Sequence, residues 1–165
     1  MIRIDDQAIW REINRLWANT PRPIAARVYN SSAISVANNT WVTLTFNAER
    51  YDTADLHSTS SNTDRLTAPA PGIYLITAHL RFQANANGDR IVSIVANGTT
   101  TIAMETQRAT AAVVHDLSIA TMYYLAAGHY VTVSVQQTSG TTLNVEATGN
   151  YSPEFAMIRL CNIKL

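Results

Sequence analysis

The stretch LTAPAPGIYLITAHLRFQ, residues 66–83, decides the fold of this protein. Pro69 and Pro71 fix the backbone and remove hydrogen-bond donors, and Gly72 permits a tight turn. The β-branched and aromatic run 73–82 that follows contains no breaker, which predicts a long strand. Because both faces of this strand are apolar, we expect a core behind it and a second covered surface in front, provided by another subunit.

The other extended segments are of two kinds. Residues 40–46 and 129–137 alternate between polar and apolar side chains, which is typical of strands with one face in solvent. Residues 112–125 and 155–163 are apolar on both faces, like residues 73–82. The two kinds of strand predict two sheets, one facing solvent and the other covered on both faces.

The N-terminal segment has a different pattern. Asp5 and Asp6 provide a helix N-cap, and Pro21 forbids continuation of a helix. Between them apolar residues recur at helical spacing, at Ile9, Trp10, Ile13, Leu16 and Trp17. We therefore predict a short amphipathic helix. Residues 1–23 would form a helix and proline linker for anchoring or oligomerisation, and residues 24–165 would form one β domain.

Composition excludes several classes of partner. The 12 Lys and Arg residues balance the 12 Asp and Glu residues, so no net charge attracts nucleic acid or an acidic membrane. The sequence contains no run of 18 apolar residues, so we expect no membrane insertion. The single cysteine, Cys161, cannot form an internal disulfide, and we expect it to be a small core residue.

Three blocks carry a resemblance to a known family: FNAERYD (46–52), LTAPAPGIYL (66–75) and YLAAGHYV (124–131). Their order and spacing resemble the signature of complement-type (C-one-q) globular heads, which belong to the tumour-necrosis-factor-like jelly rolls. The resemblance spans about residues 26–163 and implies an all-β, ten-stranded jelly-roll sandwich. It also implies a homotrimer that packs through the sheet covered on both faces.

Two departures from the family pattern narrow the expected function. His129 replaces the family's acidic residue, and a short helical leader stands in place of a collagen-like tract. In this respect the chain is similar to the heads found in bacteria and in tailed phages, where they serve as virion surface proteins. The resemblance thus implies a non-enzymatic virion structural protein, made in the host cytoplasm and located on the virion surface.

The implied role is that of a capsid-decorating or fibre-head protein, acting in particle assembly, stabilisation and surface adhesion. The N-terminal helix would bind a phage capsid or tail protein, and a host-surface glycan or protein is a further candidate partner. The alternative is a bacterial carbohydrate- or ligand-binding module with the same fold. In that case Trp41, Tyr51 and Tyr130 would form an aromatic stacking platform.

Strand alternation predicts the residues of the trimer interface. If Leu125 is a core residue, alternate positions of its strand point toward the subunit axis. Together with residues of the neighbouring strand, the predicted interface comprises Leu75, His79, Ser118, Ala120, Met122 and Tyr124. The resemblance also makes His79 and His115 neighbours. They would pair, hold an ion on the axis, or only fill space and form hydrogen bonds.

No constellation of catalytic or metal-ligating residues is recognisable. The four histidines are isolated and no nucleophile elbow occurs, so we predict no enzyme activity, metal or cofactor. Residues 85–89 resemble a calcium loop, but Ile94 occupies the glutamate position and favours a hairpin turn. The polar segment 52–65 is interpreted as a solvated loop, with a calcium or ligand site as the alternative. It is also the candidate recognition loop, through Asp52, Asp55, His57, Asp64 and Arg65.

Overall fold

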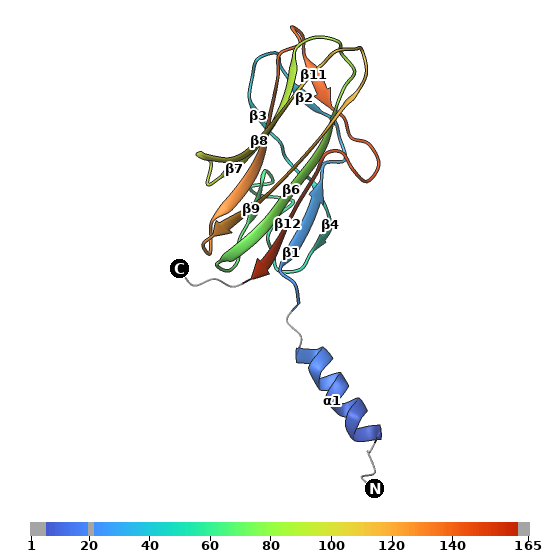
Figure 1. The fold of residues 1–165 in the computed structure, drawn as a ribbon, viewed down its shortest axis with the longest axis vertical. Helices are drawn as coiled ribbons and strands as arrows, with labels where there is room; N and C mark the ends of the chain where they lie inside the picture. The colour runs from blue at the N-terminus through green and yellow to red at the C-terminus, as the bar shows by residue number, and fades with distance from the viewer. Residues whose placement is uncertain (1–5, 20–21, 162–165) are drawn as a thin grey trace.

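The structure, a computed structural model, describes residues 6–19 and 22–161, with the backbone alone for residues 17–19. Helix α1 (Asp6–Asn19) precedes twelve strands that form two stacked antiparallel sheets (Figure 1). The strands are β1 (Ala25–Tyr29), β2 (Ile34–Val36), β3 (Val42–Thr43), β4 (Ala48–Asp52), β5 (Arg65–Thr67), β6 (Gly72–Phe82), β7 (Asp89–Ala96), β8 (Thr100–Arg108), β9 (His115–Leu125), β10 (Tyr130–Gln137), β11 (Leu143–Val145) and β12 (Glu154–Cys161).

The two sheets confirm the predicted jelly-roll sandwich. The first sheet has seven strands, β2, β11, β6, β12, β1, β4 and β9, and the second has five, β3, β10, β7, β8 and β5. The described residues form twelve strands and not the predicted ten, because in two places a pair of short strands, one after the other, occupies a single strand position in the sheet. β3 and β5 pair with one edge of β10, and β11 and β12 pair with one edge of β6.

The core lies between the two sheets and confirms the predicted alternation of the 73–82 segment. Tyr74, Ile76, Leu80 and Phe82 of β6 are completely buried, or nearly so. They face residues of the second sheet such as Val133 of β10. Each fully buried side chain of this size contributes roughly 1.5–3 kcal/mol to folding. The inward face of β6 is therefore the centre of the hydrophobic core.

The proline turn at the start of β6 is held in place by local contacts. The Tyr74 hydroxyl donates a hydrogen bond of 2.6 Å to the carbonyl of Ala70, and burial raises the pKa of this tyrosine. A Cβ atom on Gly72 would lie 2.4 Å from the carbonyl oxygen of Cys161, so only glycine permits this close approach of β6 and β12. This turn fixes the position of the longest central strand.

The prediction that Cys161 lies in the core is wrong. The pairing of β12 with β6 shifts by one residue between Arg159 and Cys161, and the cysteine is exposed. Such an irregularity changes the direction of the side chains beyond it, so alternation along β12 no longer predicts burial. Residues 162–163 of the predicted strand lie outside the described residues.

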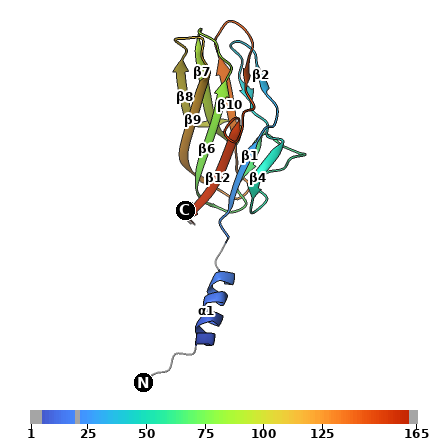
Figure 2. The same cartoon turned by 90° about the vertical axis from the view of Figure 1, so that its right-hand side faces the viewer.

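Helix α1 forms where the sequence predicts it. Both views show it apart from the two sheets, beyond the end of the sandwich at which β1 begins (Figures 1 and 2). Ile9 and Trp10 are exposed on it, and Ile13 is partly exposed. The side chain of Trp17, also predicted for the apolar stripe, lies outside the described part. Among the helices that the structure describes, none is long and apolar enough to span a membrane.

Candidate functional site

The outward face of the first sheet carries a strip of uncharged and apolar side chains together with one histidine. We call it the assembly face; its residues are Leu75, Thr77, His79, Ser118, Ala120, Met122, Tyr124 and Ile158. β6 and β9 pair along their full length, so that Leu75 lies opposite Met122 and His79 lies opposite Ser118. Met122 is 66% exposed, and Ile158 of β12 is also exposed. All six residues predicted for a subunit interface lie on this face.

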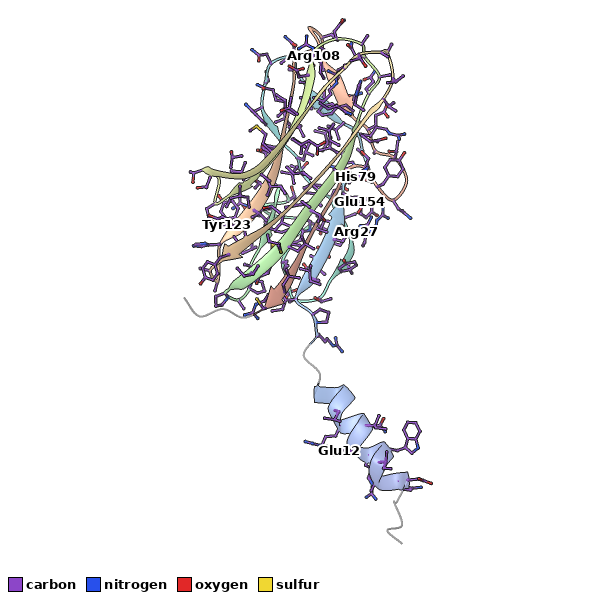
Figure 3. The ribbon with its side chains drawn as sticks, in the orientation of Figure 1. Glu12, Arg27, His79, Arg108, Tyr123 and Glu154 are labelled. Atoms are coloured by element: carbon purple, nitrogen blue, oxygen red, sulfur yellow. The ribbon has the colours of Figure 1, made fainter. Side chains whose placement is uncertain are left out.

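An ionic cluster lies beside the assembly face. Glu154 lies beside Arg27 (Figure 3). Its buried carboxylate accepts a hydrogen bond of 2.8 Å from Arg27 and bonds of 2.9 and 3.0 Å from Arg50. The Arg50 guanidinium also stacks on the ring of Tyr29 at 3.8 Å. Two guanidinium groups thus compensate one buried carboxylate, which satisfies its oxygens and leaves one excess positive charge.

A hollow of about 420 Å³ adjoins this cluster. Its walls include Arg27 and Glu154 on one side and His79 and Ser118 on the other, and Tyr51 of β4 also contributes. The hollow therefore connects the ionic cluster to the assembly face. Mainly apolar atoms line the hollow.

The two histidines of β6 and β9 point in opposite directions. His79 lies on the assembly face, where its Nδ1 atom is 2.7 Å from the carbonyl oxygen of Tyr151. His115 is buried, and its Nδ1 atom is 3.3 Å from Oε1 of Gln107. Within one chain the two rings lie on opposite faces of the sheet and do not pair. The described residues contain no group of three or more acidic, histidine or cysteine side chains that could hold a metal.

No family model and no curated protein matches this sequence. Solved structures do match it. Eiger TNF from S. frugiperda has a TM-score of 0.62 at 12% identity, over 87% of this chain and 96% of that chain. Murine APRIL at pH 5.0 has a TM-score of 0.62 at 13% identity, over 84% of this chain and 100% of that chain. The globular domain of zebrafish complement 1qA has a TM-score of 0.56 at 16% identity, over 83% of this chain and 94% of that chain.

The fold is the TNF- and complement-1q-like jelly roll. The likeness to both groups confirms the resemblance carried by the three sequence blocks. At these low identities it establishes the fold and not the function.

In this jelly roll, two of the five predicted recognition residues form hydrogen bonds that stabilise the 52–65 loop. The carboxylate of Asp52 accepts hydrogen bonds from the backbone amides of Ala54 and His57, at 3.1 and 2.8 Å. The His57 imidazole is completely enclosed, with Nδ1 3.0 Å from Glu49 and Nε2 3.4 Å from the carbonyl oxygen of Thr63. Asp52 and His57 therefore shape the loop from within.

The other three predicted recognition residues lie at the surface. Asp55 is exposed with a positive φ of 56°, and Asp64 forms an ion pair of 3.1 Å with Arg65. Asp55 and Arg65 border a hollow of about 360 Å³, and Asp64 borders a neighbouring groove on the second sheet. The structure thus keeps these three residues available for contact with a ligand.

The loop that resembles a calcium site is occupied by the protein's own cation. The completely buried guanidinium of Arg90 donates hydrogen bonds to the carbonyls of Asn85, Asn87 and Asp89, at 3.1, 2.9 and 3.2 Å. These carbonyl oxygens are the type of ligand that calcium would use. Burial lowers the pKa of Arg90. The loop is a turn closed by Arg90. This agrees with the hairpin turn predicted from Ile94, which occupies the position of the calcium-binding glutamate.

The predicted aromatic platform is divided between the two sheets. Trp41 and Tyr130 border one groove on the outward face of the second sheet, whereas Tyr51 lines the hollow on the first sheet. Sequence reasoning also missed the cluster of Arg27, Arg50 and Glu154, because Glu154 is 127 and 104 positions away from the two arginines. The single local signal is a charged residue, Glu154, at the start of an otherwise apolar strand.

Proposed function

We propose that this protein is a non-enzymatic structural protein of a virus particle, in which three copies pack through the assembly face. The observation that supports packing through this face is the exposure of apolar side chains, above all Met122 and Ile158, along the outward face of a central sheet. Contiguous apolar surface of this kind is typical of protein interfaces. The matching fold of TNF and complement domains is consistent with a binding and assembly module.

We propose further that helix α1 anchors the head to a capsid or tail protein. Ile9 and Trp10 expose apolar surface on a helix that stands apart from both sheets (Figure 2). A helix this short is marginal in water and gains stability when its apolar face packs against a partner. The partner would be a particle protein or the helices of the sister subunits. In this arrangement the head decorates the capsid or forms the tip of a fibre.

A pair of methionines provides the test of assembly. Met122 is 66% exposed on the assembly face, and Met104 is 55% exposed on the second sheet. Light scattering after size exclusion should find a trimer for the wild type and for Met104→Asp. Met122→Asp should be monomeric, because the new carboxylate would be buried without a partner. A wild type that is a folded monomer at micromolar concentration, or a trimeric Met122→Asp variant, would contradict the proposal.

The anchor is tested on purified particles of the virus that encodes the protein. Trp10→Ala together with Ile13→Ala should remove the head from particles while leaving it trimeric and folded. Glu12→Ala with Arg15→Ala is the matched control, since these two residues form an exposed ion pair of 2.5 Å on the same helix. Mass spectrometry of the particles reports the result. Normal incorporation of the Trp10 and Ile13 variant would refute the anchor.

A second candidate function is that of a carbohydrate- or ligand-binding module outside a virus. The observation that favours it is the groove that brings Trp41 and Tyr130 together. The two functions differ in the need for a particle. A protein whose gene lies outside any virus or prophage, and which never copurifies with particles, would favour the second candidate.

A further inference from the structure

The outward face of the second sheet carries a groove of about 330 Å³, which we call the hydroxyl groove. Thr43, Ser134, Ser93 and Met104 lie opposite one another across β3, β10, β7 and β8. The two serines are small, whereas Met104 and the nearby Trp41 are large. Ser93 is therefore only 2% exposed although it points away from the core, and Trp41 and Met104 are 45% and 55% exposed. The small serines thus form the floor of the groove, and the large Trp41 and Met104 side chains form its walls.

Tyr130 lies at one end of the groove, and its ring is held by two neighbours. The Arg65 guanidinium stacks on the ring at 4.2 Å. The turn of Asn97 and Gly98, with φ values of 50° and 72°, brings backbone close to the hydroxyl. A Cβ atom on Gly98 would lie 2.9 Å from the Tyr130 oxygen, so glycine leaves room for this side chain. The aromatic end of the groove is thus formed before any ligand binds.

The floor of the groove is made of hydroxyl groups. Thr43 Oγ1 and Ser134 Oγ are 3.1 Å apart, and Ser93 donates a hydrogen bond of 3.3 Å to the carbonyl oxygen of Ser134. Thr132 lies between Tyr130 and Ser134 on the same face of β10. A hydroxyl has one donor and two acceptor positions, so Thr132 and Ser134, which line the groove at 6% and 9% exposure, keep hydrogen-bonding positions for a ligand.

The charge of the groove is balanced. Asp64 is the one ionisable acid among its lining residues, and Arg65 pairs with it at 3.1 Å. A charged ligand would therefore find no uncompensated partner in the groove. A purely apolar ligand would cover the hydroxyl floor without satisfying its hydrogen bonds, which costs free energy.

We infer that the hydroxyl groove binds an uncharged saccharide. The C–H face of a sugar ring packs on the exposed Trp41 side chain and the partly exposed Tyr130 side chain, and its hydroxyls meet those of Thr132 and Ser134. The groove volume lies within the roughly 300–1,000 Å³ of small-ligand sites. The groove and the assembly face lie on opposite outward faces of the sandwich, so packing through the assembly face leaves the groove open.

The proposed function includes adhesion to a surface, and this inference names uncharged saccharides as the ligand class for that adhesion. Its biological meaning rests on the proposed function. It also moves the main recognition surface from the 52–65 loop to the second sheet. Only Asp64 and Arg65 of the predicted loop residues take part, as the polar pair at the Tyr130 end. Because one chain forms the whole groove, binding is measured without a particle.

The test starts with the full-length protein on an array of neutral and sialylated oligosaccharides, followed by calorimetric titration of the neutral oligosaccharide with the strongest signal. Trp41→Ala should weaken binding about tenfold, as expected for one lost aromatic contact. Thr132→Val keeps the shape of the floor and should weaken binding several-fold. Tyr51→Ala is the control, since this tyrosine is 49% exposed but lies on the other sheet. Its affinity should equal that of the wild type.

Three results would overturn the inference: no neutral oligosaccharide binds, only sialylated ones bind, or Trp41→Ala binds as tightly as the wild type. Circular dichroism melts confirm that each variant is folded, which the exposure of Trp41 favours. The Met122→Asp variant separates the two proposals. If it is monomeric and keeps the affinity of a single site, both stand. If the wild type does not form trimers but binds sugar, the trimer proposal alone fails.

Discussion

Arg27 Nε donates a hydrogen bond of 2.8 Å to Glu154 Oε2, although the two residues are 127 positions apart in the sequence. The bond links β1 to β12, and Arg50 adds β4 through the other carboxylate oxygen. Glu154 is buried, while the Arg27 side chain is 42% exposed. One carboxylate thus joins three neighbouring strands beside the assembly face.

The first prediction concerns this carboxylate. Glu154→Gln keeps the shape of the side chain but leaves two arginines without a counter-charge. Breaking a buried ion pair costs about 3–5 kcal/mol, and the partial exposure of Arg27 reduces the expected loss to about 2–3 kcal/mol. Denaturant melts measure it. Asp55→Asn, at an exposed acid, should change stability by less than about 0.5 kcal/mol. Equal effects would show that the cluster does not stabilise the fold.

The second prediction is a pH dependence at the ion pair between β6 and β9. Arg81 donates two hydrogen bonds of 2.8 Å to Asp116, and they hold the pKa of this carboxyl below its usual value of 3.8. A lowered pKa in the folded state adds stability above the pKa of the unfolded chain. This stability is lost as the pH falls through the folded pKa.

The wild type should therefore exceed Asp116→Asn in stability at neutral pH, by about 0.2–1 kcal/mol because the pair is partly exposed. The difference should vanish in strong acid. Thermal melts across this pH range test it. In an Arg81→Gln background the same Asp116→Asn change should have a much smaller pH-dependent effect, since only His79 and His115 then lower the pKa of Asp116. A difference that persists below the lowered pKa would disprove the assignment.

The third prediction tests the register of β10. Val133 is completely buried in the core, and Thr132 points to the hydroxyl groove. Val133→Ala should cost about 1–3 kcal/mol through lost burial and a cavity. Thr132→Val has nearly the same shape and should cost less than about 1 kcal/mol. Because a shift of one residue exchanges the faces, the opposite order in denaturant melts would mean that the register is wrong.

The fourth prediction concerns the arginine that closes the 85–89 loop. Arg90→Met leaves buried carbonyls of the loop without donors and should cost about 3 kcal/mol. Arg108→Met is the control, since Arg108 is 74% exposed and contacts the same Asp89 at 3.3 Å. It should cost less than about 1 kcal/mol. Stabilisation of the wild type by calcium in thermal melts would contradict the view that Arg90 occupies the cation position.

Hydrophobic alternation was enough to predict which side chains of the main strands enter the core. It placed Tyr74, Leu80 and Phe82 inside and Met122 and Tyr124 outside, because side chains of a strand alternate with a period of two whatever the strand pairs with. The helical spacing of apolar residues in turn located the amphipathic helix. The order of the three sequence blocks predicted the jelly roll, which the solved structures confirm.

Strand alternation failed where pairing departs from the ideal ladder or where neighbours on other strands set the burial. Cys161 is exposed because β12 shifts register before it. Ser93 is buried on an outward face because larger side chains from adjacent strands rise around it. Both outcomes depend on how the strand pairs and packs with other strands.

The sequence by itself therefore determined the core faces of the long strands and the N-terminal helix, since each follows from periodicity within a short segment. The jelly-roll class followed from the order of the three blocks that resemble a known family. Only the tertiary structure decided that Glu154 meets Arg27, that Arg90 fills the calcium-like loop, and that Trp41 and Tyr130 share a groove without Tyr51. The physical reason is that contacts between distant segments depend on strand register and on the size of side chains across the sheet.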